Sequence, residues 1–285
     1  MQIGVSLPTT IPGAEGDQLI EFARRADRLG FHSLTTLDRV VYDNYDAIVA
    51  LAAAAAVTER IKLVTAILLA ASRPSAVELA KQLASLDRLS GGRLVVGVSA
   101  GMREDDYTAT GTDHGRRGRR LDAMLVEMRD TWRGNGPQPA VGPRPVKDDI
   151  PIWVGGHSPQ ALRRAARHGI GWISPGGPPH KFPDLVAKVK DAWAAEGRTD
   201  SPRMAANCHV SLGPGGGELA TEHLNSYYSF MGNRAAHLAA GAITEADRLR
   251  EAVDGYSANG CDELLLLTCS ADPGQLDLIA DAVLK

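Results

Sequence analysis

Two glycine pairs in this chain stand where a backbone could bind an anion. The first opens the turn Gly155 to Ser158 (GGHS), between an apolar run and a segment with helical periodicity, and the second is Gly176-Gly177. Glycine allows close backbone approach and positive φ. A helix that starts after such a turn offers unpaired N–H groups and the positive end of its dipole. The turn can therefore hold a phosphate, or it can be a tight strand–helix turn in which Ser158 caps the helix.

Charged side chains at two other places could do chemistry. Asp38-Arg39 follows an apolar run and could contact a substrate or cofactor, or form a plain surface ion pair. The carboxylates at 104–106 could include a general base, or could lie in a solvated loop that resembles a helix start. The run 114–120 (HGRRGRR) could bind an anionic tail or be a solvated helix start.

The histidines do not indicate a metal site. His157 alone has a positional argument, because it lies in the glycine turn. The remaining histidines show neither HxH nor HExxH spacing, so no zinc site is expected.

Composition narrows the class of protein. The chain has 285 residues, of which 44% are hydrophobic and 23% charged, so it can bury a sizeable core. Its net charge of -3 does not favour nucleic acid or an anionic membrane as partner. A small-molecule substrate is the expected partner.

Cysteines and apolar runs add to this expectation. Cys208, Cys261 and Cys269 form no CxxC pair and are expected to be small buried or strand residues. The N-terminus has no signal-peptide pattern, and no apolar run reaches the roughly 18 residues of a membrane span. These features predict a cytoplasmic protein.

Strand-length apolar runs alternate with helical segments along the chain, which predicts a parallel sheet with right-handed crossovers. The predicted strands are 3–7, 31–37, 61–69, 93–98, 150–154, 170–174, 204–212 and 263–268. The predicted helices are 17–29, 46–58, 74–89, 117–132, 159–168, 182–196, two or three pieces within 217–259, and 273–284.

Eight strand–helix units in a chain of this length fit a (β/α)8 TIM barrel formed by a single domain, 1–285. A doubly wound sheet could also contain eight units, but the loop after the first strand has no GxGxxG fingerprint. In a barrel, the active site lies at the C-terminal ends of the strands. Both glycine pairs and Asp38-Arg39 fall there.

Several segments together resemble the bacterial-luciferase-like family of flavin- and deazaflavin-dependent oxidoreductases. They are 22–39, 60–101, 116–125 and 151–172 (PIWVGGHSPQALRRAARHGIGW). The resemblance runs from residue 3 to about residue 177, with a weaker match near 260–267, and the region 200–259 adds little to it.

The resemblance implies a (β/α)8 barrel with a flavin-type ring across the strand ends. It implies a bulge at the end of the third strand with a non-prolyl cis peptide, and the loop after the fourth strand would flank the ring. Carried over to this chain, the cofactor-binding residues are Thr65, Ala66, Ile67, Gly97, Gly101, Met102, Gly155, Gly156, His157, Ser158, Gly176 and Gly177. The cis bond would be Ala66–Ile67.

This chain departs from the family pattern at two positions. Many relatives have Asp-His where it has Asp38-Arg39, and the deazaflavin-dependent sugar-phosphate dehydrogenases have a catalytic Glu where Met102 stands. Their alcohol-oxidising machinery therefore cannot be transferred. Arg39 is a fixed cation and no general base, although it could orient an anionic substrate or polarise a carbonyl. Asp38 and Arg39 are the candidate catalytic residues.

Two cofactors fit the resemblance. The compact length, the short loops and the PIWVGGxS…RRAAR pattern resemble the coenzyme F420 branch, in which Arg116, Arg117 or Lys181 could meet the anionic tail. The preferred function is then hydride transfer from reduced coenzyme F420 to a small unsaturated or carbonyl substrate. The alternatives are an FMN monooxygenase working with a separate reductase, and a non-catalytic flavin-binding barrel. Barrels of this family usually pair, which implies a homodimer.

Overall fold

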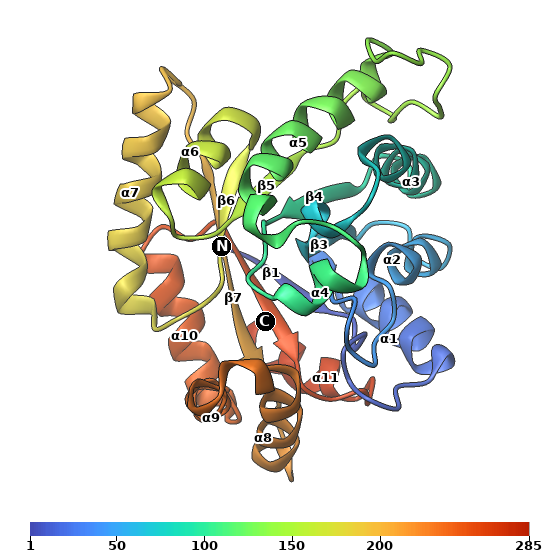
Figure 1. Cartoon of the computed structure of the whole chain (residues 1–285). Helices are drawn as coiled ribbons and strands as arrows, with labels where there is room; N and C mark the ends of the chain where they lie inside the picture. The colour runs from blue at the N-terminus through green and yellow to red at the C-terminus, as the bar shows by residue number, and fades with distance from the viewer. Residues whose placement is uncertain (285) are drawn as a thin grey trace.

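Eight parallel strands close into a barrel in which each strand pairs with its neighbours in chain order and β8 pairs with β1 (Figure 1). The computed structural model describes residues 1–284. The strands are β1 (Gln2–Ser6), β2 (Ser33–Thr36), β3 (Lys62–Leu68), β4 (Leu94–Val98), β5 (Ile152–Gly155), β6 (Gly171–Ser174), β7 (Arg203–Val210) and β8 (Glu263–Thr268). The single-domain (β/α)8 barrel expected from the sequence is confirmed.

Helices form the outer layer around these strands (Figure 1). They are α1 (Gly16–Leu29), α2 (Ala47–Ala55), α3 (Ala76–Leu89), α4 (Glu104–Ala109), α5 (Arg117–Arg133), α6 (Pro159–His168), α7 (Phe182–Ala195), α8 (Gly216–Tyr227), α9 (Asn233–Ala240), α10 (Ala246–Ala258) and α11 (Gln275–Val283). Short 3-10 turns are η1 (Ala70–Ser72), η2 (His114–Arg116), η3 (Pro179–Lys181) and η4 (Ser229–Met231).

The expected elements differ from the observed ones mainly in extent. The strand predicted at 31–37 is shorter, since β2 spans only Ser33–Thr36. The region 217–259 holds α8, α9 and α10, in agreement with the prediction of two or three pieces. The helix start considered for 104–106 is confirmed, since these residues form the first turn of α4, but the solvated setting is wrong for Asp106, which is fully buried.

The apolar residues form two packing layers around the barrel wall, and a third, small cluster that includes Cys269 lies at α8 and α9. The large outer cluster lies between strands and helices, and a smaller cluster fills the inside of the barrel with Trp153, Ile173 and Leu265 among its members. Inward and outward side chains alternate along barrel strands, so each strand contributes to both layers. The free cysteines fit this packing, since Cys261 and Cys269 are buried and Cys208 lies in β7.

The end of β3 is irregular. Its register with β4 shifts between Thr65 and Leu68, and the Ala66–Ile67 peptide bond is cis, so the expected bulge and cis bond are both confirmed. The Thr65 hydroxyl donates to the Gly97 carbonyl over 2.8 Å. A Cβ at Gly97 would lie 2.2 Å from the Thr65 carbonyl oxygen, so β3 and β4 can approach this closely only because residue 97 is glycine.

None of the helices within residues 1–284 combines the length and the apolar character needed to cross a membrane.

Candidate active site

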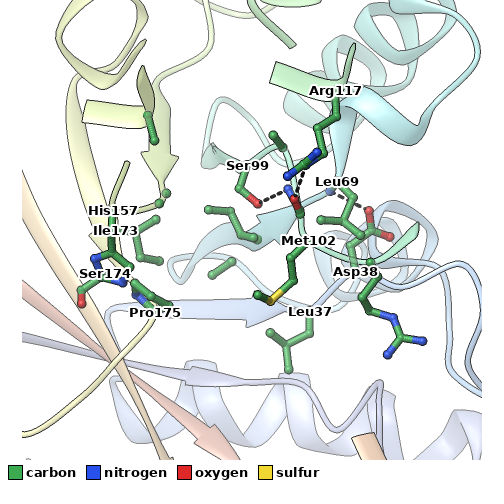
Figure 2. A pocket seen from close by; sticks show the side chains of 18 of the residues that line it. Leu37, Asp38, Leu69, Ser99, Met102, Arg117, His157, Ile173, Ser174 and Pro175 are labelled. Atoms are coloured by element: carbon green, nitrogen blue, oxygen red, sulfur yellow. Dashed lines mark hydrogen bonds between the residues drawn. The ribbon is translucent and has the colours of Figure 1, made fainter. Parts of the chain in front are cut away.

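A cavity of about 750 Å³ opens where the strands end. Figure 2 shows His157, Ser174 and Pro175 on one side of it, Asp38 and Leu69 on the other, and Met102 between them. We call the part lined by the β5–α6 turn and the starts of α5 and α6 the α6 end. The opposite part, lined by Leu37, Arg39, Tyr227, Tyr228 and Phe230, is called the aromatic end.

The β5–α6 turn brings backbone amides and a helix start to the cavity. Ser158 is the N-cap of α6, and its Oγ accepts a hydrogen bond of 3.2 Å from the Ala161 N–H. Gly156 has a φ of 117°, and a Cβ there would lie 2.9 Å from the Ala161 side chain. Only glycine fits this position without strain. The turn is thus a true strand–helix turn with a serine cap, and it also faces the cavity.

Two arginines line the α6 end. Arg117 donates to the carbonyls of Gly101 and His114, at 3.1 and 2.9 Å. Arg164 is buried and pairs with Asp122, and it also donates to the Gly118 carbonyl over 2.9 Å. These contacts fix both guanidinium groups at the cavity wall, and the charge of Arg164 is paired with Asp122.

His157 and Gln160 complete the α6 end. The ring of His157 lies edge-on to Trp172, with 6.0 Å between centroids. Burial and the nearby Lys188 charge lower the pKa of His157. His157 is therefore neutral near pH 7 and offers one donor and one acceptor rather than a charge.

Ala66, Ile67 and Leu69 line the cavity from the bulged end of β3, and Ser99 to Met102 line it from the loop after β4. The Gly101 N–H donates to Ser99 Oγ over 3.2 Å, which shapes that loop. Met102 is 64% exposed and extends into the middle of the cavity (Figure 2). An apolar, flexible side chain thus stands between the two ends.

Asp38 lies at the cavity wall but is fully engaged by protein groups. Its Oδ1 accepts from Arg73 over 2.7 Å and its Oδ2 accepts from the Leu69 N–H over 2.9 Å. Burial raises the pKa of Asp38, and the Arg73 charge offsets part of this effect. The surface ion pair considered for Asp38 and Arg39 is wrong, because they are only 4% and 7% exposed and have different partners.

Arg39 is held by a buried carboxylate and by aromatic rings. Its Nε lies 3.4 Å from Asp106 Oδ2, and it donates to the carbonyls of Val41 and Tyr227. Asp106 also accepts from the N–H groups of Val40 and Val41, at 2.9 and 2.8 Å. Asp106 is therefore a buried structural anchor, which contradicts its reading as a general base.

The aromatic end was missed by sequence reasoning. Tyr227, Tyr228 and Phe230 lie at the end of α8 and the start of η4, within the region that seemed to add little. The guanidinium of Arg39 lies 5.4 Å from the centre of the Tyr227 ring, and that of Arg103 lies 4.2 Å from the centre of Phe230. The run YYSF was the available signal, in a chain with only 5% aromatic residues.

Most of the predicted cofactor-binding residues line the cavity, but four do not: Thr65, Gly97, Gly176 and Gly177. Thr65 and Gly97 shape the β3–β4 contact below it. Gly176 packs against Asn207, and the Gly177 carbonyl accepts from the Tyr256 hydroxyl. The second glycine pair therefore supports the wall of the cavity from behind.

The basic run 114–120 is divided between two roles. Arg117 lines the cavity, whereas Arg120 donates to the carbonyls of Ala71, Arg73 and Pro74 and so fixes the loop after β3. Arg116 and Lys181 are exposed and do not line the cavity. Among the residues of the described chain, no three His, Cys, Asp or Glu side chains are grouped as a metal ion requires.

Comparisons with known proteins agree with this architecture. Residues 1–265 match the model of a family described as luciferase-like monooxygenase. An uncharacterised protein of Mycobacterium tuberculosis is 32% identical over 212 residues, 63% of this chain and 73% of that protein. The oxygenase component of a flavin-dependent trigonelline monooxygenase of Acinetobacter baylyi is 25% identical over 237 residues, 76% of this chain and 65% of that protein.

Solved structures share the fold. The monooxygenase RslO1 of Streptomyces bottropensis superposes with a TM-score of 0.83 at 24% identity, covering 100% of this chain and 99% of that one. An F420-dependent secondary alcohol dehydrogenase in complex with an F420-acetone adduct superposes with a TM-score of 0.80 at 18% identity, covering 99% and 98%.

Proposed function

This chain belongs to the luciferase-like monooxygenase family, and on that premise we propose that it is an oxidoreductase that transfers a hydride from reduced coenzyme F420 to a small unsaturated or carbonyl substrate. The observation that carries this proposal is the α6 end of the cavity, where the start of α6 and Arg117 line the same cavity. The family membership supports a flavin or deazaflavin chemistry, and the α6 end supports an anionic cofactor.

The residues at the α6 end fit such a cofactor. Gly156 presents no Cβ to the cavity, and the polar residues that line this end are Ser158, Gln160, Arg117 and Arg164, of which Arg164 is already paired with Asp122. Helix N-termini and arginines are the preferred ligands of phosphate groups. The cavity volume of about 750 Å³ lies within the usual range of about 300–1,000 Å³ for cofactor and ligand sites.

In this proposal the protein binds the cofactor, orients its ring and keeps water away from it. Gly155 to Ser158, with Arg117, would hold the anionic part, and Ile67 and Met102 would contact the ring. When bound, the reduced deazaflavin supplies the hydride, and the chemistry of that transfer is the cofactor's own. The apolar lining from Leu37, Ile67, Leu69 and Met102 keeps water away from the reacting carbon.

Reduction is the proposed direction because no carboxylate in the described cavity lining is free to accept the proton of an alcohol. Of the lining residues within 1–284, Asp38 is the only carboxylate, and both of its oxygens accept hydrogen bonds from protein groups. Met102 stands where alcohol-oxidising relatives are expected to have Glu, and it cannot accept a proton. Asp38 and Arg39 are proposed to shape the substrate end by fixing its loops.

An FMN-dependent monooxygenase that works with a separate flavin reductase is the second candidate. The names of the Acinetobacter baylyi relative and of the Streptomyces bottropensis structure favour it. Both candidates use the same α6 end, so the cofactor decides between them.

Titration of the purified protein with coenzyme F420 and, separately, with FMN tests the proposal, with binding followed by cofactor fluorescence. We expect micromolar or tighter binding of coenzyme F420, since cofactor sites with a helix start and arginines bind anions well. Tight FMN binding without a response to coenzyme F420 favours the monooxygenase. Binding of neither cofactor contradicts both candidates.

Gln160 offers a matched pair of variants for locating the anion. It is exposed in the first turn of α6 and lines the cavity. Gln160→Glu places a negative charge where it favours the helix but repels a phosphate, so cofactor affinity should fall about tenfold or more while the melting temperature holds. Gln160→Met removes the amide without adding charge and should retain most of the affinity. Equal affinity of both variants contradicts the phosphate assignment.

A further inference from the structure

The charged groups around the aromatic end are already neutralised by partners within the protein. Arg39 pairs with Asp106, and Arg103 pairs with Asp105 and lies 3.6 Å from Asp106 Oδ2. On the other wall, Arg73 pairs with Asp38 and Asp46. An ionic substrate would have to leave water for a site that offers it no unpaired counter-charge, which is unfavourable.

The same end presents a fixed hydroxyl. Tyr228 lines the cavity, and its Oη lies 3.2 Å from Nε2 of His209, which is near the end of β7. The two rings are nearly perpendicular, with centroids 5.6 Å apart. The β7 backbone at this point is held by the Ile243 N–H, which donates to the His209 carbonyl over 2.9 Å. His209 therefore sets the direction of the Tyr228 hydroxyl.

The imidazole of His209 is neutral in the folded protein. Burial lowers the pKa of His209 to about 3, and its Nδ1 is shielded from solvent without a hydrogen-bond partner in the described chain. A neutral imidazole has one donor and one acceptor nitrogen, in either tautomer. When Nε2 carries the proton it donates to Tyr228, whose own hydrogen can then point to a carbonyl. When Nε2 accepts, the Tyr228 oxygen can accept from a hydroxyl.

From these relationships we propose that the aromatic end binds an uncharged, flat, largely apolar substrate, and that the Tyr228 hydroxyl, positioned by His209, hydrogen-bonds to a carbonyl or hydroxyl oxygen of that substrate. The flat shape follows from the surrounding rings of Tyr227, Tyr228 and Phe230, which favour stacked or edge-on aromatic contacts. This inference rests on the proposed function and narrows its substrate class. It excludes the anionic substrate considered for Arg39.

Three probes of one shape test this inference: 2-acetylnaphthalene, 2-ethylnaphthalene and 2-naphthoate, the ketone, the apolar analogue and the anion. Binding is measured by calorimetry with the full chain, alone and saturated with coenzyme F420 or FMN. We expect the ketone to bind best. The apolar analogue should bind about fivefold more weakly, because it lacks one hydrogen bond. The carboxylate should bind more than about tenfold more weakly, because its charge would be buried without a partner.

Variants separate a hydrogen bond from a packing effect. Tyr228→Phe should lower the affinity for the ketone about fivefold and leave the affinity for 2-ethylnaphthalene unchanged. Tyr45 is not among the residues that line the cavity, and its hydroxyl donates to the Ala14 carbonyl, so Tyr45→Phe is the control for loss of a tyrosine hydroxyl and should change neither affinity. His209→Leu should reproduce the selective loss, and His209→Gln, which retains a polar partner for Tyr228, should restore part of it.

The binding results test the Tyr228 assignment and the uncharged substrate class separately. Equal losses for ketone and apolar probe in Tyr228→Phe make Tyr228 a packing residue and overturn the inference. Tight binding of 2-naphthoate overturns the uncharged substrate class. If neither coenzyme F420 nor FMN binds but the ketone preference is present in the protein alone, the proposed function fails while the Tyr228 assignment stands.

Discussion

Oδ2 of Asp38 accepts a hydrogen bond of 2.9 Å from the backbone N–H of Leu69, and this bond ties the loop after β2 to the bulged end of β3. The other oxygen of Asp38 binds Arg73, which follows the same bulge. A single buried carboxylate thus holds two walls of the cavity together. Its position at the strand ends resembles that of a catalytic acid, but its contacts are those of an anchor.

Substitution of Asp38 distinguishes these two roles. Asp38→Ala removes both acceptors and leaves Arg73 partly unpaired, so the free energy of unfolding should fall by about 3–5 kcal/mol. Asp38→Asn keeps an acceptor for the Leu69 N–H, so its free energy of unfolding should fall by less. Urea denaturation of both variants measures this. Unchanged stability of Asp38→Ala, with activity lost, would instead identify Asp38 as a catalytic residue.

Asp106 should be among the most sensitive positions in the chain. Asp106→Asn leaves the buried guanidinium of Arg39 without its counter-charge, which should lower the free energy of unfolding by about 3–5 kcal/mol. Asp105→Asn removes the neighbouring carboxylate, which is 41% exposed and pairs with Arg103, and should change stability by at most about 1 kcal/mol. Similar melting temperatures for the two variants would contradict the buried anchor.

Gly97 should not tolerate a methyl group. In Gly97→Ala the new Cβ would lie 2.2 Å from the Thr65 carbonyl oxygen, so β3 and β4 must separate beside the bulge, at a loss of about 1–3 kcal/mol or more. Gly217→Ala is the control, because a Cβ there meets nothing within 4 Å and α8 should gain a few tenths of a kcal/mol. Chemical denaturation compares them. Equal stability of both variants would show that the strands are not in close contact.

Acid should destabilise the barrel partly through two buried histidines. Burial lowers the pKa of His209 to about 3 and that of His223 to about 4, whereas an unfolded histidine titrates near 6.5. The unfolded state therefore takes up these protons first, and stability is full above about pH 6.5 and falls as the pH drops toward 4. Each histidine contributes up to about 1.4 kcal/mol per pH unit in that window.

Urea denaturation between pH 4 and pH 7 checks this slope, with His223→Gln and His209→Gln each expected to flatten it. The histidine ring-proton signals in NMR spectra of the folded protein give an independent reading. Signals of His209 and His223 that titrate near pH 6.5 would contradict the expected burial.

The sequence predicted those features that depend on neighbouring residues. Strand and helix periodicity gives the barrel, and the GGHS turn carries its own information, since glycine permits the φ of Gly156 and serine caps the following helix. The bulge at Ala66–Ile67 came from family resemblance rather than from periodicity.

The partners of the charged residues could not be predicted in this way. Asp38 binds Arg73, 35 positions away, and Arg39 binds Asp106 across the barrel mouth. Such pairs produce no periodic pattern in the sequence, because they depend on which loops the closed barrel brings together. The aromatic end was missed for the same reason, since Tyr227 reaches Arg39 only after α8 returns over the strand ends.

The excursion between β7 and α10 begins and ends at one place. Val210 and Ile243 pair as a parallel bridge, and the Ser211 N–H donates to the Ile243 carbonyl over 2.9 Å. The chain between these two residues, which includes Tyr227, Tyr228 and Phe230, leaves the barrel at Val210 and returns to it at Ile243. Because the ends of the segment are held together by the scaffold, a replacement of different length needs little extra closure entropy. The segment 211–243 is accordingly a suitable unit for replacement by the corresponding segment of another barrel. Such a replacement would change the substrate preference and leave the β5–α6 turn unaltered.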